Sequence, residues 1–303
     1  MTWTTSEIGD LSGQTAVVTG PSYGGIGYET ALELAHHGAR VVLAGRSQAK
    51  LDDAAARIDA AAPKARVERV VVDLSDLASV RTAAAAIADL GPVHRLVNNA
   101  GVMATPYRRT VDGLELQLAT NHFGPFLLTG LLLPALASSG AGRVVTVSSL
   151  GHRLAPRAPL GDPRAEGRYL RWPTYFQTKL ANLLFTYQLD RLLREAGLPV
   201  KALAAHPGFV SSHLISNGSS FGPVSRIIDA VYPIVSQPPV KGAWPSLMAT
   251  TADLPGSTYV GPSGLRETQG APTVVHSTRL SHHPDAQRRL WAISERTTEI
   301  SYP

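Results

Sequence analysis

The chain has 303 residues, of which 44% are hydrophobic and 17% are charged, and its formal net charge is +5. These fractions are typical of a globular protein and exclude a disordered or fibrous chain. The chain contains no cysteine, which excludes disulfides, thiolate catalysis and cysteine-ligated zinc and fits a reducing compartment.

The polar N-terminus and the short apolar runs indicate a cytoplasmic protein. The first residues, MTWTTSEIGDLSGQ, lack the basic region followed by an apolar stretch that marks a signal peptide. The most apolar run, residues 127–137, is shorter than the roughly 20 residues that span a bilayer, and Pro134 interrupts it. We therefore expect no membrane span, and we interpret this run as a buried helix.

Much of the positive charge falls in residues 143–171, which hold six arginines against two acidic residues, a net charge of +4. Because aromatic residues do not alternate regularly with these arginines, a solvated surface loop is favoured over a site for an anionic ligand or nucleic acid.

Strand and helix patterns alternate along the chain. Residues 15–19 form a short apolar, β-branched run that Gly20 ends, and residues 28–37 place Ala31, Leu34 and Ala35 on one helical face. The same pair of patterns then repeats. Strands are predicted over residues 15–19, 41–44, 67–72, 95–97, 143–147 and 200–204, and helices over 28–37, 51–62, 76–90 with Ser75 as its cap, most of 114–137, and 175–196.

Apolar strands separated by helices predict a parallel sheet that helices cover on both faces. Right-handed crossovers make such a sheet doubly wound. We therefore expect a single α/β domain of the Rossmann type over residues 1–303, with about seven strands. Two irregular insertions, residues 150–174 and 211–240, follow carboxyl ends of predicted strands, where doubly wound sheets bind ligands. They are candidate substrate lids.

A glycine-rich loop, in the sequence VVTGPSYGGIGYET, joins the first predicted strand to the first predicted helix. In that context backbone N–H groups and the positive end of the helix would face a pyrophosphate. Four residues separate the first glycine from the GIG triplet, where the usual pattern has three. Pro21 offers no N–H, but Gly24 relieves steric limits on the backbone. We expect a bulged loop that still binds phosphate, with Tyr23 beside the adenosine; a plain flexible turn is the alternative. The expected cofactor contacts here are Gly20, Ser22, Tyr23, Gly25, Ile26 and Gly27.

Tyr175 and Lys179 lie four residues apart in a predicted helix, so their side chains share one face. A lysine ammonium beside a phenol favours the phenolate. Moving a tyrosine pKa from about 10 towards 7 takes roughly 4 kcal/mol, and one nearby charge in a partly dry cleft supplies energy of that order.

Six motifs in this order make the chain resemble the short-chain dehydrogenase/reductase family, and within it the retinol-dehydrogenase-like members. The resemblance covers about residues 14–300. Its motifs are Thr19-Gly20 with Gly25-Ile26-Gly27, NNAG at residues 98–101, NHFGPFLLT at 121–129, VVTVSSLGH at 144–152, Tyr175 with Lys179, and HPGFVSS at 206–212.

The resemblance implies an oxidoreductase in which Tyr175 is the general acid/base toward a carbonyl or hydroxyl oxygen. Lys179 would lower the pKa of that phenol and hold the nicotinamide ribose. Ser149 would orient the reacting oxygen, with Ser148 a structural neighbour, and Asn121 would hold a water that relays protons from Lys179 to solvent. Taken singly, Asn121 could instead be a polar residue inside a helix, and Ser149 a cap at a strand end.

The same resemblance implies further cofactor contacts at the strand ends. It assigns the adenine pocket to Asp73 and Leu74, ribose and strand contacts to Asn99, Ala100 and Gly101, and the nicotinamide contact to Pro207, Gly208, Val210 and Ser212, with Tyr175 and Lys179 also at the cofactor. Ser212 stands where threonine is common, and its hydroxyl keeps a hydrogen bond to the carboxamide available.

The end of the second predicted strand indicates which nicotinamide cofactor is bound. NAD sites carry a carboxylate there, which accepts hydrogen bonds from the ribose 2′-hydroxyl. This chain reads VVLAGR over residues 41–46, without an acidic residue and with Arg46 at the tip. Because a guanidinium pairs with a 2′-phosphate, we predict NADP(H).

Apolar residues in and beside the second insertion favour a lipophilic alcohol, aldehyde or ketone as the substrate, although such residues also pack loops onto their own domain. They are Phe209, Leu214, Ile215, Phe221 and Trp244. The chain is expected to be a monomer or a homodimer.

Two other functions stay open. A non-catalytic, NADP-sensing regulator or scaffold is disfavoured because all four catalytic positions are present. A serine hydrolase has a G-x-S-x-G match at residues 218–222, with Asp253 or Asp285 and His276 or His282 downstream, but the strand and helix that must flank this motif are missing from the pattern. The ten histidines show no metal-ligand spacing, so no metal is expected.

Overall fold

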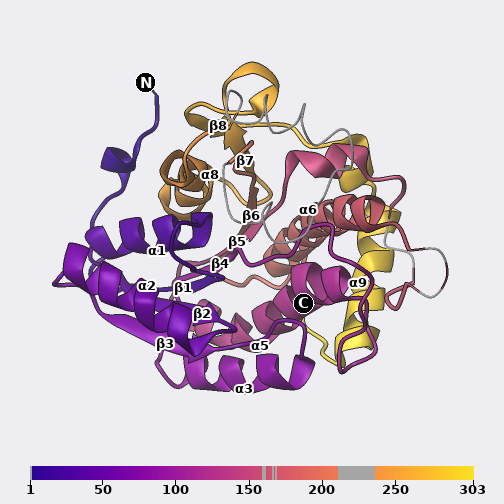
Figure 1. The fold of residues 1–303 in the computed structure, drawn as a ribbon, viewed down its shortest axis with the longest axis horizontal. Helices are drawn as coiled ribbons and strands as arrows, with labels where there is room; N and C mark the ends of the chain where they lie inside the picture. Colours follow the sequence, from indigo (N-terminus) through magenta and orange to yellow (C-terminus); the bar gives the residue numbers. More distant parts are fainter. Residues whose placement is uncertain (1, 159–161, 166, 168, 211–235) are drawn as a thin grey trace.

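The computed structural model describes residues 2–158, 162–165, 167, 169–210 and 236–303. In these residues one eight-stranded sheet runs in the order β3-β2-β1-β4-β5-β6-β7-β8, with helices packed on both of its faces (Figure 1). The strands are β1 (Thr15–Thr19), β2 (Arg40–Gly45), β3 (Val67–Val71), β4 (Arg95–Asn98), β5 (Gly142–Val147), β6 (Val200–Ala205), β7 (Tyr259–Pro262) and β8 (Pro272–Val274).

The predicted doubly wound sheet is confirmed, and all six strands that the apolar runs predicted are present. The pairs from β3 to β7 are parallel, and the strand order turns back on itself between β1 and β4. The strand number differs from the prediction because β8 adds an antiparallel edge to β7. A hairpin of this kind needs no crossover helix, so the strand-helix alternation gave no sign of it.

Successive residues of the strands point to opposite faces of the sheet and build two apolar cores. Val17 and Val42 pack with the helices of one face, whereas Val18 and Val41 pack with those of the other. The first core is covered by α3 (Leu77–Ala88), α5 (Gly124–Ser138) and α6 (Arg171–Glu195), and the second by α1 (Ile26–His36), α2 (Gln48–Ala61) and α8 (Pro239–Thr251).

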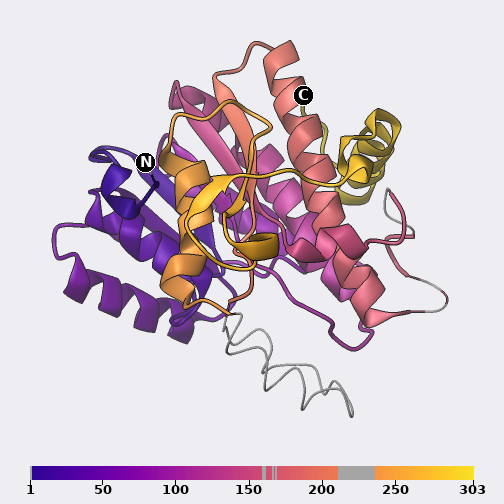
Figure 2. The same ribbon diagram turned by 90° about the horizontal axis from the view of Figure 1, so that it is seen from above.

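The C-terminal helix α9 (Pro284–Thr298) packs against α6 and α5, and its Trp291 belongs to the first core of the sheet. In Figure 2 it stands, in yellow, beside the long helix α6. Its Trp291 stacks on Phe185 of α6 at 6.0 Å and meets Phe126 of α5 edge-on at 5.1 Å. An aromatic cluster therefore fastens the last helix to the domain.

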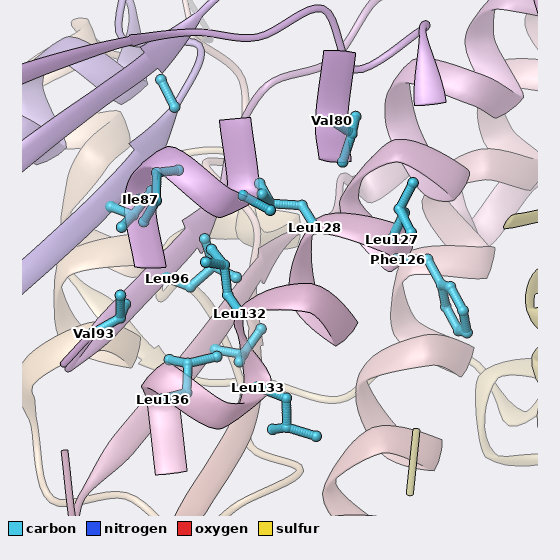
Figure 3. Close-up of a cluster of buried hydrophobic side chains, with 14 of the residues drawn as sticks. Val80, Ile87, Val93, Leu96, Phe126, Leu127, Leu128, Leu132, Leu133 and Leu136 are labelled. Atoms are coloured by element: carbon cyan, nitrogen blue, oxygen red, sulfur yellow. The ribbon is translucent and has the colours of Figure 1, made fainter. Parts of the chain in front are cut away.

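The apolar run at residues 127–137 forms the buried part of α5, as expected, and Pro134 stays inside the helix. Figure 3 shows its side chains interleaved with those of α3 and β4. No described helix is both long enough and apolar enough to cross a membrane.

Three details of the helices differ from the sequence prediction. Asp76, not Ser75, caps α3, because its carboxylate accepts from two N–H groups of the first turn while the Ser75 hydroxyl donates to Asp73. The stretch 114–137 is three pieces, α4 (Leu116–Leu118), a π-helical turn η2 (Ala119–Phe123) and α5. Helix α6 begins at Arg171, four residues before the prediction, because a proline in the first turn, Pro173, loses no helical hydrogen bond.

The predicted lids are only partly described. Residues 150–174 contain the 3₁₀ turn η3 (Leu150–Leu154) and the first turn of α6. Of the second insertion, residues 211–235 lie outside the described residues, and its end leads into α8.

Candidate active site

The predicted site residues gather at one edge of the sheet. Because the strands β1 to β6 are parallel, the residues that follow their carboxyl ends lie along the same edge. These residues are Gly20 after β1, Arg46 after β2, Asp73 after β3, Asn99 after β4, Ser149 after β5 and Pro207 after β6.

The glycine loop absorbs its extra residue in a tight turn. The Gly25 N–H donates to the Ser22 carbonyl oxygen at 3.0 Å. Gly24, the third residue of this turn, has φ +75°, the left-handed conformation that a type II turn requires there. Gly25 is the N-cap of α1 and makes no side-chain cap hydrogen bond. The first N–H groups of α1 are therefore available to an anion, although phosphate binding itself stays a prediction.

The other glycines of the loop permit close packing on the end of β4. A Cβ on Gly27 would lie 2.4 Å from Asn99 Nδ2 and 2.7 Å from the Gly20 oxygen, and one on Gly20 would lie 2.9 Å from Ala100 Cα. Asn99 Nδ2 donates to the carbonyl oxygens of Thr19 and Gly20, at 2.8 and 3.3 Å. Asn99 thus makes the predicted strand contact and uses both of its amide hydrogens for it.

Tyr23 projects from the turn and is 51% exposed. Its ring lies 3.8 Å from the Arg57 guanidinium and meets Tyr28 edge-on at 5.1 Å. The ring is thus held at the mouth of the loop by a cation–π contact, and its place beside an adenosine remains a prediction.

Asn121 lies in the π-helical turn η2 because the residue four positions on is a proline. Pro125 carries no N–H, so the Asn121 carbonyl cannot accept the ordinary helical bond. The Asn121 side chain makes its hydrogen bonds within the protein. Oδ1 accepts from the Val102 N–H at 2.8 Å, and Nδ2 donates to the Val102 carbonyl oxygen at 2.9 Å and to Thr178 Oγ1 at 3.0 Å. The Asn121 amide thus has no hydrogen left to donate to a water, and the water contact itself stays a prediction.

Lys179 lies beneath Tyr175 on α6. Its Nζ is 5.8 Å from the centre of the Tyr175 ring and donates to the Val147 carbonyl oxygen at 3.1 Å. Burial lowers the pKa of Lys179 to about 8, because a dry site disfavours the charged amine. A Cβ on Gly101 would lie 3.6 Å from the same Nζ and 3.1 Å from Asn121 Oδ1. The structure thus brings Gly101, Asn121, Tyr175 and Lys179 together.

The two serines after β5 have different surroundings. Ser148 is buried, and its hydroxyl donates to the Lys179 carbonyl oxygen at 2.8 Å. Ser149 begins the turn η3, where its Oγ accepts from the Gly151 N–H at 3.1 Å. Ser148 is therefore a structural residue, while Ser149 keeps the hydrogen of its hydroxyl for a further acceptor. Ser149 is also a cap, so its two sequence interpretations are compatible.

The residues after β2 and β3 lie at the part of the edge where adenosine is expected. Arg46 is exposed, and no ion pair of its guanidinium is found within the described ranges. Asp73 Oδ1 accepts from the Ser75 N–H and hydroxyl, at 2.9 and 2.6 Å. The Leu74 side chain belongs to the core below α5, so an adenine contact at Leu74 would be made through its backbone.

The turn after β6 is tied to two other segments. Gly208 has φ +68°, and a Cβ there would lie 2.3 Å from the Thr268 oxygen. The Phe209 N–H donates to the same Thr268 oxygen at 2.8 Å, and Gln237 Nε2 donates to the Pro207 oxygen at 2.8 Å. Val210 pairs with Gln237 in an isolated bridge. Ser212 lies outside the described residues, as do Leu214, Ile215, Phe221 and the G-x-S-x-G stretch 218–222.

Sequence reasoning missed a polar cluster behind this turn, in which His206 is buried, Glu267 is partly exposed and Arg153 is exposed. His206 Nε2 lies 3.0 Å from Glu267 Oε2, and Arg153 Nη2 lies 2.7 Å from Glu267 Oε1. Burial lowers the pKa of His206, and hydrogen bonds from His206 and Arg153 lower that of Glu267 against the effect of its burial. His206 stood in a quoted motif, but Glu267 is 61 positions further on and carried no signal.

Aromatic side chains line a pocket of about 330 Å³ beside the start of α6. Trp172, in its wall, meets the Tyr175 ring edge-on at 6.2 Å. The lining residues are Pro106, Tyr107, Tyr169, Leu170, Arg171, Trp172 and Pro173. Trp244, which sequence reasoning placed near the substrate, lines a second pocket of about 480 Å³ with Gln237 and Lys241.

A doubly wound sheet with a glycine loop after β1 and a Tyr-Lys pair on the helix after β5 defines the nicotinamide-dependent short-chain dehydrogenases. The chain belongs to this family, since the family model described as "short chain dehydrogenase" matches residues 14–220.

Within the family the chain is retinol-dehydrogenase-like. It is 44% identical to human retinol dehydrogenase 12 over 210 residues, which are 69% of this chain and 65% of that protein, so the match spans just under two thirds of the relative. A crystal structure of a Mycobacterium paratuberculosis protein is 39% identical, covers 100% of both chains and has a TM-score of 0.81. A Beutenbergia cavernae protein assigned as an NAD(P)-dependent gluconate 5-dehydrogenase is 26% identical with a TM-score of 0.61 over 80% of this chain and 91% of that one. Its crystal structure has NADP bound at low occupancy.

The residues present fit the nicotinamide cofactor that this family binds. The glycines of the loop leave space where a Cβ would collide, and the start of α1 makes no side-chain cap hydrogen bond. Arg46 is exposed at the β2 tip, and Lys179 is buried at the opposite end of the site. Backbone donors for a pyrophosphate and cations for phosphate and ribose groups are therefore in place.

Proposed function

We propose that the protein is an NADP(H)-dependent oxidoreductase that moves a hydride between nicotinamide and the carbonyl or hydroxyl carbon of a lipophilic aldehyde, ketone or alcohol. Tyr175 is the general acid/base. The observation that carries this proposal is the buried Lys179 ammonium 5.8 Å from the centre of the Tyr175 ring. A cation in a dry site favours the phenolate, so the phenol can exchange its proton near neutral pH.

The cofactor supplies or accepts the hydride when it is bound. In the reductive direction the Tyr175 hydroxyl donates its proton to the substrate oxygen, and in the oxidative direction the phenolate takes it back. The Ser149 hydroxyl accepts from the Gly151 N–H and donates its own hydrogen to the substrate oxygen. Because the pKa of Lys179 is lowered only to about 8, about nine tenths of the amine is charged at pH 7. A water on the Asn121 carbonyl returns protons between Lys179 and solvent.

The preference for NADP(H) rests on Arg46. Its guanidinium follows β2 directly, is exposed, and has no acidic residue beside it in the sequence. A bidentate pair with a 2′-phosphate is the contact that this group makes best. Arg46→Ala should therefore weaken NADPH binding by about tenfold or more, and leave NADH binding unchanged. Equal affinity of the wild type for NADPH and NADH would contradict the assignment.

The preference for a lipophilic substrate is supported by the aromatic pocket beside Tyr175. Its wall is built from Pro106, Tyr107, Tyr169, Leu170 and Trp172, and its volume lies at the small end of the range for ligand pockets. Trp172→Ala should raise KM for long-chain aldehydes more than for short ones, because it removes apolar contact area and leaves the reacting oxygen in place.

The test of the proposed reaction is NADPH consumption with aldehydes and ketones of increasing chain length. Tyr175→Phe should lose turnover and keep NADPH binding, since only the exchangeable proton is removed. Tyr187→Phe is the matched control, because Tyr187 lies on the same helix and its hydroxyl pairs with Ser277 at 2.7 Å. NADPH binding without turnover of any carbonyl by the wild type would favour an NADP-sensing scaffold instead.

A further inference from the structure

We propose that Glu267 is a positioning residue that fixes the turn at residues 207–210 relative to the turn that begins at Ser149. Its carboxylate stands between them, with Oε2 3.0 Å from His206 Nε2 and Oε1 2.7 Å from Arg153 Nη2. His206 directly precedes the first turn, and Arg153 lies in the second. The inference rests on the proposed function, in which the first turn faces the nicotinamide and Ser149 faces the substrate oxygen.

On one side the Glu267 carboxylate determines which ring nitrogen of His206 carries the hydrogen. The Gly208 N–H donates to His206 Nδ1 at 3.2 Å, so the ring hydrogen is on Nε2 and donates to Glu267. The ring is fully buried, and β7 leaves room for it at Gly261, where a Cβ would lie 2.0 Å from His206 Nε2. Glu267 thus holds the tautomer that can accept the Gly208 N–H.

On the other side the carboxylate anchors the Ser149 turn through Arg153. The Ser149 carbonyl oxygen accepts from the His152 N–H at 3.1 Å, and it lies 2.7 Å from His152 Nδ1. The Ser149 hydroxyl oxygen accepts from the Gly151 N–H. Because Arg153 is the next residue of this turn, fastening its guanidinium limits movement of the serine that the turn begins with.

The backbone at Glu267 is held in a conformation that residues with a Cβ avoid. Arg266 has φ +52° and Glu267 has φ +59°, both in the left-handed region. A left-handed conformation of a non-glycine residue persists only where the surrounding structure holds it, and such residues are frequent at functional sites. Here the Glu267 N–H donates to the Gly264 oxygen at 2.8 Å, and the next residue, Thr268, accepts from the Phe209 N–H.

Only a carboxylate can serve both partners. His206 Nε2 and Arg153 Nη2 both donate, so the residue between them must offer an acceptor on each side. Glutamine has the same shape, but its amide nitrogen would face one of these donors. Turning the imidazole to the other tautomer would point a ring hydrogen at the Gly208 N–H. Glu267→Gln therefore breaks the link without changing the size of the side chain.

The experiment compares Glu267→Gln with Glu195→Gln in the full chain. Glu195 pairs with Arg191 at 3.2 Å at the end of α6, on the surface, and is the matched control. We expect kcat of Glu267→Gln to fall by about tenfold to a hundredfold, since small misplacements of reacting groups cost that much. We also expect weaker NADPH binding and unchanged binding of 2′,5′-ADP, which lacks the nicotinamide. The double variant with Arg153→Gln should lose no more than Glu267→Gln alone.

Three results would overturn the inference: kcat equal to that of the control, additive losses in the double variant, or equal weakening of NADPH and 2′,5′-ADP binding. If Glu267→Gln does not fold, the kcat of Arg153→Gln is compared with that of the control instead. Arg153 is exposed, so its substitution should not prevent folding. A wild type that turns over no carbonyl would defeat the proposed function alone. The comparison of NADPH with 2′,5′-ADP would then still decide the role of Glu267.

Discussion

Lys179 is required for the proposed chemistry, and the structure predicts that it destabilises the protein without bound cofactor at neutral pH. Burial lowers its pKa from the ordinary 10.5 to about 8. At about 1.4 kcal/mol per pH unit, this interval corresponds to about 3.5 kcal/mol. The folded-state pKa lies below the unfolded one, so the cost is present in full below about pH 8. It disappears as the pH rises from about 8 to 10.5.

Lys179→Met removes the charge and keeps an unbranched apolar stem. The Val147 carbonyl oxygen is not left alone, because Asn182 Nδ2 donates to it at 3.1 Å. With about 1 kcal/mol deducted for the lost hydrogen bond, the variant should be more stable than the wild type by about 2.5 kcal/mol at pH 7. By pH 10.5 it should be less stable by about 1 kcal/mol.

Urea unfolding of both proteins without cofactor, at pH 7 and pH 10.5, measures this difference. The variant should also lose NADPH-dependent turnover. Other titrating groups contribute equally to both proteins, so their effects cancel in the comparison. A stability difference that is the same at both pH values would refute the reasoning, because it would mean that the buried amine is not titrating between them.

Four further substitutions test the packing of the site and the fold. Gly27→Ala should weaken NADPH binding by about tenfold or more, because its Cβ would lie 2.4 Å from Asn99 Nδ2; unchanged binding in a fluorescence titration would contradict this. Trp291→Ala should lower the free energy of unfolding by about 3–5 kcal/mol, since the ring is 7% exposed; a loss below about 1 kcal/mol would mean that α9 is not fastened by this cluster. Asp76→Ala should cost about 1 kcal/mol through the lost helix cap, with Ser75→Ala costing less because Ser75 does not cap α3.

The part of the fold that local pattern determines was predictable from the sequence. The six strands with continuous β-branched and apolar runs were found, and with them the edge of the sheet where the site lies. Strand β7 was missed because its four residues include Gly261 and Pro262, and β8 because it has three residues. Helix α9 did carry a signal, a proline at its start and an apolar stripe through Leu290 and Trp291, which was not used.

Features that depend on contacts distant in sequence were not predictable. The Glu267 link needs the loop between β7 and β8 to reach both β6 and η3, and no spacing in the chain encodes that approach. The left-handed backbone at Arg266 and Glu267 gives no sign in residue type, since neither is glycine or asparagine. The π-helical turn differs, because Pro125 four positions after Asn121 is a local cause that the sequence displays.

The motif residues differ in how much hydrogen-bonding capacity they keep for a ligand. Asn99 and Asn121 each use both amide hydrogens inside the protein, and Ser148 donates to backbone. These side chains can position the site but have no hydrogen left to donate to a ligand. Ser149 keeps its hydroxyl hydrogen, and Arg46 keeps its guanidinium clear of acids within the described residues. The proposed reacting groups are thus surrounded by polar residues whose hydrogen bonds are made within the protein. Such bonds hold the geometry of a site when no ligand is bound.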